Sequence, residues 1–207
     1  MVEDKFIHDK NKDMQIDTIK QIEMFVREHL HALSHGFDHT RRVYNLCLHI
    51  GQVENAELKS LLPAALLHDI GRDLEEHLGA DHAESAEYLA KDFLKQINYP
   101  KNYIEPIFEA IKSHRASNET TPQTVEARIL SDADKLDSLG AIGIARVFTF
   151  GGSRGRDVIG TIAYFKSRLQ RVQAQLFTET AKRIAAERLT YTSSFLKKMS
   201  EEDAGIR

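Results

Sequence analysis

An adjacent histidine and aspartate, His68 and Asp69, are the residues of this sequence best suited to metal chemistry, because they follow a strongly apolar run. Residues 58–67 are mainly Leu and Ala, so a helix made from them is apolar on nearly all sides and is expected to be buried. Burying an imidazole and a carboxylate is costly unless a partner compensates for their lost hydration. A divalent metal ion accepts a neutral imidazole nitrogen and a carboxylate oxygen together. The alternative is a helix cap or a salt bridge at the helix end.

Further histidines and acidic residues lie at the expected starts and ends of other helices. They are His39, His82, His114, Asp132 and Asp134. Each alone has a structural interpretation, because a His or Asp in a first turn commonly caps a helix or interacts with its dipole. Together with His68 and Asp69 they supply nitrogen and oxygen ligands that leave positions for water, as a hydrolytic metal centre requires.

The elements that must position these residues are helices. Apolar residues recur at helical spacing along most of the chain, and no stretch of useful length alternates as a strand does. The predicted helices cover residues 16–33, 38–53, 58–67, 81–97, 104–113, 122–148, 161–177 and 179–199. A glycine-rich, basic loop is predicted over Gly151–Arg156. The predicted fold is therefore all-α: a compact single-domain helical bundle over residues 16–200, with the C-terminal helices packed on it and a flexible N-terminal segment over residues 1–15.

The composition excludes several classes of protein. Lys and Arg number 28 and Asp and Glu number 31, so the net charge of −3 does not favour long nucleic acid or a membrane surface as partner. The one cysteine, Cys47, cannot form an internal disulfide, which fits a reducing cytoplasm. The chain has neither a signal-peptide pattern at its start nor the ~20 consecutive apolar residues of a membrane span. A cytoplasmic protein is expected.

The order His39, His68-Asp69 and Asp134 resembles the His…His-Asp…Asp signature of the HD-domain superfamily of metal-dependent phosphohydrolases. Longer stretches are similar to a subgroup of small bacterial single-domain HD proteins. These stretches are residues 36–43, 65–71, 131–143, 151–152 and 178–182. The similarity extends over most of the chain and implies the HD-type helical bundle.

The resemblance implies a set of ligands for a divalent metal ion, namely His39, His68, Asp69 and Asp134. Asp134 is preferred to Asp132 because the last ligand of the superfamily typically precedes one residue and then Leu. Two-metal relatives carry further histidines at places resembling His82 and His114, and Asp69 would then bridge the ions. The sequence leaves open whether one or two ions bind, and whether they are Mn, Mg, Co, Ni, Fe or Zn.

The same resemblance implies hydrolysis of a phosphate ester or anhydride by a water molecule that the metal activates. A nucleotide is the expected substrate, with a triphosphate cleaved to release pyrophosphate as one form of the reaction. Asp69 and Asp73 are the candidate catalytic residues, with Asp73 as general acid or base. The candidates for binding substrate phosphate are Arg72, Lys135, Arg146, Arg154 and Arg156. Backbone N–H groups of the Gly151–Arg156 loop are an additional candidate.

The sequence departs from the family pattern at two places. Tyr164 stands where the subgroup often has His, and Arg72-Asp73 stands where some nucleotide-hydrolysing relatives have Glu-Asp. Two alternatives therefore stay open: a di-iron oxygenase, which needs His82 and His114 as ligands, and a metal- or nucleotide-binding regulatory module without turnover. The exposed faces of the two C-terminal helices allow a homodimer.

Overall fold

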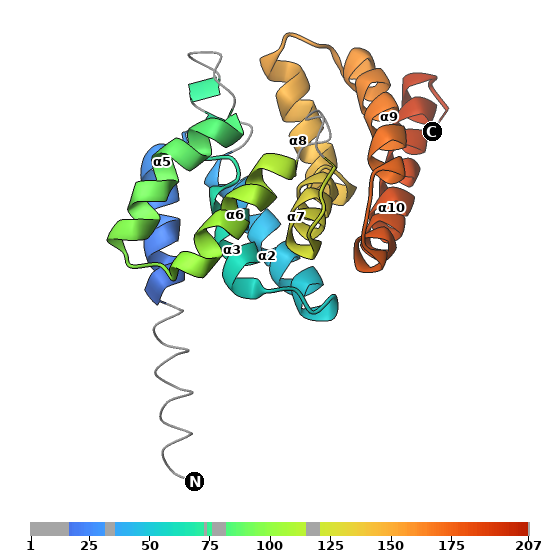
Figure 1. The fold of residues 1–207 in the computed structure, drawn as a ribbon. Helices are drawn as coiled ribbons and strands as arrows, with labels where there is room; N and C mark the ends of the chain where they lie inside the picture. The colour runs from blue at the N-terminus through green and yellow to red at the C-terminus, as the bar shows by residue number, and fades with distance from the viewer. Residues whose placement is uncertain (1–16, 32–35, 73, 76–81, 115–120, 207) are drawn as a thin grey trace.

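A computed structural model describes residues 17–31, 36–72, 74–75, 82–114 and 121–206, and these residues form helices and connections without strands (Figure 1). The predicted flexible segment 1–15 lies outside the described residues. A first helix covers residues 17–29. The helices that follow are α2 (Phe37–Val53), α3 (Leu58–Leu67), α5 (His82–Gln96), α6 (Lys101–Ser113), α7 (Val125–Leu136), α8 (Gly140–Ser153), α9 (Val158–Ala174) and α10 (Glu179–Asp203). The prediction of an all-α fold is confirmed.

Helix α3 lies at the centre of the bundle and packs against α2, α6 and α7. Every residue from Ser60 to Leu67 is buried, as its apolar composition predicts. Helices α8, α9 and α10 pack against one another on the other side of α7, with α10 also in contact with α7 (Figure 1). They add a smaller apolar cluster around Phe165 and Leu196 to the main core.

The predicted continuous helix over residues 122–148 is wrong, because the chain breaks it between α7 and α8. Gly140 adopts the left-handed backbone conformation with φ of 72°, which favours glycine. A Cβ at Gly143 would lie 2.2 Å from the carbonyl oxygen of Ser138, so only glycine allows this close approach. These two glycines permit the sharp turn that lets α8 leave the axis of α7.

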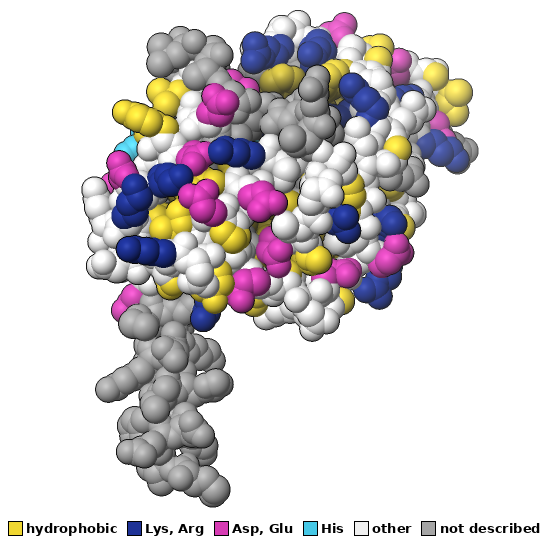
Figure 2. All heavy atoms as spheres, viewed as in Figure 1, with side chains coloured by type: hydrophobic (Ala, Val, Ile, Leu, Met, Phe, Trp, Pro, Cys, Tyr) yellow, Lys and Arg dark blue, Asp and Glu magenta, His cyan; other side chains and the backbone are white. Residues whose placement is uncertain are grey.

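The predicted glycine-rich loop also differs from the structure, because residues 151–153 form the last turn of α8. A Cβ at Gly151 would lie 2.2 Å from Oγ1 of Thr161, so this glycine lets α8 and α9 approach closely. Within the part of the chain that the structure describes, no helix has the length and apolar character needed to cross a membrane. Figure 2 shows positive and negative side chains interspersed over one face of the molecule.

Candidate metal centre

Three helices bring the predicted ligands together. His39 lies in the first turn of α2, His68 caps the C-terminus of α3 with Asp69 next to it, and Asp134 lies in the last turns of α7. One ligand atom from each of His39, His68 and Asp134 lies within 4.8 Å of the others. Oδ2 of Asp69 lies 3.5 Å from Nε2 of both histidines, and Oδ1 of Asp134 lies 3.3 Å from Nε2 of His39. The four residues therefore form one cluster of nitrogen and oxygen atoms.

The second nitrogen of each histidine has its own partner. Nδ1 of His39 lies 2.7 Å from Oδ2 of Asp137, and Nδ1 of His68 lies 2.8 Å from the carbonyl oxygen of Ala65. Such partners fix the orientation of each ring, so that Nε2 faces the cluster. This is the arrangement that metal-binding histidines usually have.

The buried atoms of the cluster fit a metal ion. Nε2 of His68 and Oδ2 of Asp69 are buried and make no hydrogen bond to any residue that the structure describes. Leaving buried polar atoms without partners is costly. A divalent ion bound by His39, His68, Asp69 and Asp134 would satisfy both atoms with the donor types that transition metals prefer.

The electrostatics of the cluster favour a cation. Burial opposes protonation of His39, but its contacts with Asp134, Asp137 and Asp69 outweigh burial and raise its pKa to about 10. Burial also opposes ionisation of Asp69, yet His68, His39 and Arg72 hold its pKa well below the usual range. The carboxylates are therefore ionised at neutral pH, and positive charge at the cluster is stabilised.

The sequence analysis gave no role to Asp137, which organises one side of the cluster. Asp137 is buried and accepts hydrogen bonds from Nε and Nη2 of Arg42 at 2.6 and 3.1 Å, and it also forms an ion pair with Arg146. Arg146 lies 3.0 Å from Nδ1 of His39 as well. The spacing carried a signal, because Asp137 follows Asp134 and Arg42 follows His39 by one helical turn.

Arg72, predicted to bind substrate, has partners within the protein. Its Nε donates to Oδ1 of Asp69 at 2.7 Å, and its Nη1 donates to Oε2 of Glu75 at 2.8 Å. Its side chain is 14% exposed. The structure thus places Arg72 beside the cluster as a partner of a candidate ligand.

The remaining predicted histidines and Asp73 differ in what the structure describes. His114 is buried, and its ring centre lies 5.4 Å from that of His68. Burial and the nearby His68 lower the pKa of His114 to about 4, so its imidazole is neutral. Asp73 and the side chain of His82 lie outside the described residues.

Asp132 faces away from the cluster and binds the start of α10. Its carboxylate accepts hydrogen bonds from the backbone N–H groups of Phe177 and Thr178 at 2.9 and 2.8 Å, and from the Thr178 hydroxyl at 2.7 Å. Of the two acidic residues, Asp132 and Asp134, only Asp134 reaches the candidate metal centre.

Lys135, predicted to bind phosphate, donates to the backbone oxygen of Ser131 at 3.3 Å.

Arg154 and Arg156 follow α8, and each lies near an aromatic ring. The guanidinium of Arg156 lies 4.4 Å from the ring centre of Tyr164, and the guanidinium of Arg154 lies 5.5 Å from the ring centre of Phe150. The backbone N–H groups of residues 154–156 donate to carbonyls of the last turn of α8. They are therefore not available to a phosphate group, contrary to the prediction for this loop. The two side chains stay candidates.

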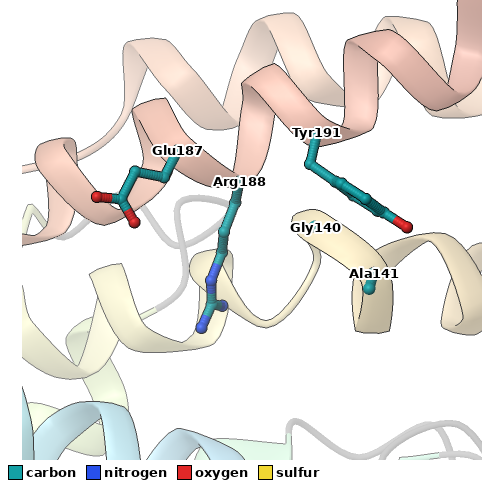
Figure 3. Close-up of a pocket in the computed structure, with 5 residues that line it drawn as sticks. All are labelled: Gly140, Ala141, Glu187, Arg188 and Tyr191. Atoms are coloured by element: carbon teal, nitrogen blue, oxygen red, sulfur yellow. The ribbon is translucent and has the colours of Figure 1, made fainter.

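A separate open pocket lies between the start of α8 and α10, lined by Gly140, Ala141, Glu187, Arg188 and Tyr191 (Figure 3). Arg188 extends from α10 toward α7, where its Nη1 donates to the carbonyl oxygen of Leu136 at 2.6 Å. None of the candidate metal ligands lines this pocket.

Comparison with known proteins agrees with the fold and with the motif. The family model of the HD domain matches residues 36–139, a range that contains all four candidate ligands. The uncharacterized protein YpgQ of Bacillus subtilis (strain 168) is 30% identical over 199 residues, which cover 93% of this chain and 97% of that protein.

Two solved structures are similar over nearly the whole chain. A predicted HD superfamily hydrolase from an uncultured Thermotogales bacterium has a TM-score of 0.69 at 31% identity, with 88% of this chain and 91% of that chain covered. Bacillus subtilis YpgQ in complex with ADP has a TM-score of 0.76 at 28% identity, with 92% and 96% covered. The helical fold, the His…His-Asp…Asp cluster and these similarities show that the chain belongs to the HD-domain family.

Proposed function

We propose that this chain is a metal-dependent phosphohydrolase that acts on a small phosphate ester or anhydride, with a nucleotide as substrate. The observation that carries the proposal is the cluster itself, in which atoms of His39, His68 and Asp134 lie within 4.8 Å of one another. Nε2 of His68 and Oδ2 of Asp69 support it, because both are buried and make no hydrogen bond to a residue that the structure describes. A divalent ion held by these residues supplies a water molecule of lowered pKa and charge that offsets the charge of phosphoryl oxygens.

The protein's own side chains hold the ligands in position. Asp137 binds the Nδ1 side of His39, and the carbonyl of Ala65 binds that of His68, so both rings expose Nε2. Arg72 holds Oδ1 of Asp69 and keeps this carboxylate ionised. These contacts place the four ligands before an ion arrives, which reduces the reorganisation that binding requires.

We place the substrate phosphate on the side of the cluster that is open to solvent. Asp134 is 32% exposed and Arg146 is 24% exposed, whereas His39, His68 and Asp69 are buried. Burial lowers the pKa of Arg146 and the neighbouring cations Arg42 and Arg168 lower it further, against the opposing effect of Asp137 and Asp134. The cations Arg42, Arg146 and Arg168 near this opening can attract the anionic groups of a substrate.

The ADP complex of YpgQ supports a nucleotide as the substrate, because that protein shares the fold over 92% of this chain. Cleavage of a nucleoside triphosphate with release of pyrophosphate is the form of the reaction that we favour. Arg146 is our first candidate for a phosphate contact, and Lys135, Arg154 and Arg156 are further candidates. Asp73 is our candidate for general acid or base.

The proposal is tested by removing metal from the protein, adding back Mn²⁺, Mg²⁺, Co²⁺, Ni²⁺ or Zn²⁺, and assaying a panel of AMP, ADP, ATP and dATP. We expect metal-dependent release of phosphate or pyrophosphate that is lost in His39→Ala and His68→Ala. His49→Ala is the matched control, because His49 is an exposed histidine on the same helix as His39. Stoichiometric binding of an ion without turnover of any of these nucleotides would contradict the proposal.

A further inference from the structure

The two oxygens of the Asp69 carboxylate have different surroundings. Oδ1 accepts a hydrogen bond from Nε of Arg72 at 2.7 Å. Oδ2 is buried, makes no hydrogen bond to a described residue, and lies 3.5 Å from Nε2 of both His39 and His68. Oδ2 is therefore the oxygen that faces an ion between the histidines, whereas Oδ1 lies against the positive charge of Arg72.

Several contacts hold Arg72 against Asp69. Its Nη1 donates to Oε2 of Glu75 at 2.8 Å, and its backbone N–H donates to the carbonyl of Asp69 at 3.0 Å. A guanidinium is charged at all relevant pH values and its planar group of donors matches carboxylates well. The positive charge of Arg72 is thus fixed between two carboxylates, beside one oxygen of Asp69.

A second metal ion would need the oxygen that Arg72 occupies. An aspartate that bridges two ions gives one oxygen to each, and metal–oxygen bonds are shorter than the hydrogen bond that is present here. The guanidinium would have to leave Oδ1, and its charge would repel an ion in the same place. A further imidazole lies near the cluster: the ring centre of His114 is 5.4 Å from the ring centre of His68.

We propose that Arg72 restricts the centre to one metal ion by occupying Oδ1 of Asp69. The inference rests on the proposed function for the identity of the metal ligands. It makes Arg72 a positioning residue rather than a substrate contact. It also argues against di-iron oxygenation in this chain, because that chemistry requires two ions in the centre.

The test measures how many Mn²⁺ ions the full chain binds, by equilibrium dialysis with metal analysis and by Mn²⁺ EPR. We expect the wild type to bind one ion per chain with the spectrum of an isolated Mn²⁺. Arg72→Met keeps a long side chain without its charge, and Arg72→Glu adds an oxygen ligand. We expect each of these two variants to bind a second Mn²⁺ ion and to give an exchange-coupled EPR spectrum. Arg72→Lys keeps the charge and Arg171→Ala removes an exposed arginine on α9, so both should bind one ion.

The possible results separate the two proposals. Two ions in the wild type, or one ion in both folded Arg72→Met and Arg72→Glu, would overturn the inference and leave the hydrolase proposal standing. Loss of all Mn²⁺ from both folded variants would also overturn it, because Arg72 would then support the first ion rather than exclude a second. One ion in the wild type without nucleotide turnover would contradict only the hydrolase. No Mn²⁺ in the wild type would contradict both.

Discussion

Asp137 determines which nitrogen of His39 faces the other candidate ligands. It binds Nδ1 of this histidine at 2.7 Å, and it is itself held by Arg42 and Arg146. An imidazole can present either nitrogen, and a carboxylate on one of them fixes the tautomer and the ring orientation. The side chains that bind the ligands are therefore as much a part of this centre as the ligands.

We expect Asp137→Asn to weaken Mn²⁺ binding by about 10–100-fold, because the amide no longer provides a full negative charge at Nδ1 of His39. Isothermal titration with Mn²⁺ measures the effect. Asp203→Asn is the control, since Asp203 is an exposed acid at the end of α10. Equal Mn²⁺ affinity in Asp137→Asn and in the control would show that Asp137 does not support His39 as a ligand.

Helix α3 contains a proline in its interior although it lies in the buried centre of the bundle. Pro63 lies within the helix and cannot donate a hydrogen bond to the carbonyl of Lys59, four residues earlier. The hydroxyl of Tyr99 donates to this carbonyl instead, at 2.6 Å. A side chain that is distant in sequence thus replaces the missing helical hydrogen bond, and α3 continues to His68 and Asp69.

Tyr99→Phe should therefore lower the free energy of unfolding by about 0.5–1.5 kcal/mol, the usual net contribution of one hydrogen bond. Urea denaturation followed by circular dichroism measures this. Tyr191→Phe removes the hydroxyl of an exposed tyrosine and should change the unfolding free energy by much less. Similar stabilities for the two variants would mean that water satisfies the Lys59 carbonyl.

At the scale of the whole molecule, two carboxylates join the C-terminal helices to the rest of the bundle. Asp132 of α7 accepts three hydrogen bonds from Phe177 and Thr178, and Glu54, the C-cap of α2, accepts one from the N–H of Thr180 at 3.1 Å. They bind backbone donors at the N-terminus of α10, where a negative charge is stabilised. These contacts help to hold the N-terminus of α10 against α7 and α2.

For Asp132→Ala we expect a loss of about 1–3 kcal/mol in unfolding free energy, because the partly buried N–H groups of residues 177 and 178 lose a charged acceptor. Differential scanning calorimetry of this variant beside Asp203→Ala measures the difference. An unchanged melting temperature in Asp132→Ala would show that α10 is held by its apolar contacts alone.

The helical fold was predictable from sequence because it depends on local patterns, and apolar periodicity identified nearly every helix. The ligand set of His39, His68, Asp69 and Asp134 was predictable because its order along the chain resembles the signature of the HD-domain superfamily. The break at Gly140 was missed because the residues on both sides keep a helical pattern, whereas the turn uses the positive φ of Gly140 and the close approach of Gly143 to Ser138. The partnership of Arg72 with Asp69 was missed because an arginine near a predicted phosphate site was interpreted by its charge alone.

The most direct test of the central claim is hydrolysis of a nucleoside triphosphate in H₂¹⁸O by protein without metal and by Mn²⁺-loaded protein. The account predicts that only the loaded wild type forms product, and that one ¹⁸O atom enters a phosphoryl group, because water attacks phosphorus. His68→Ala treated in the same way should give no product above background. Product formation at equal rates with and without Mn²⁺, or in His68→Ala, would contradict the account.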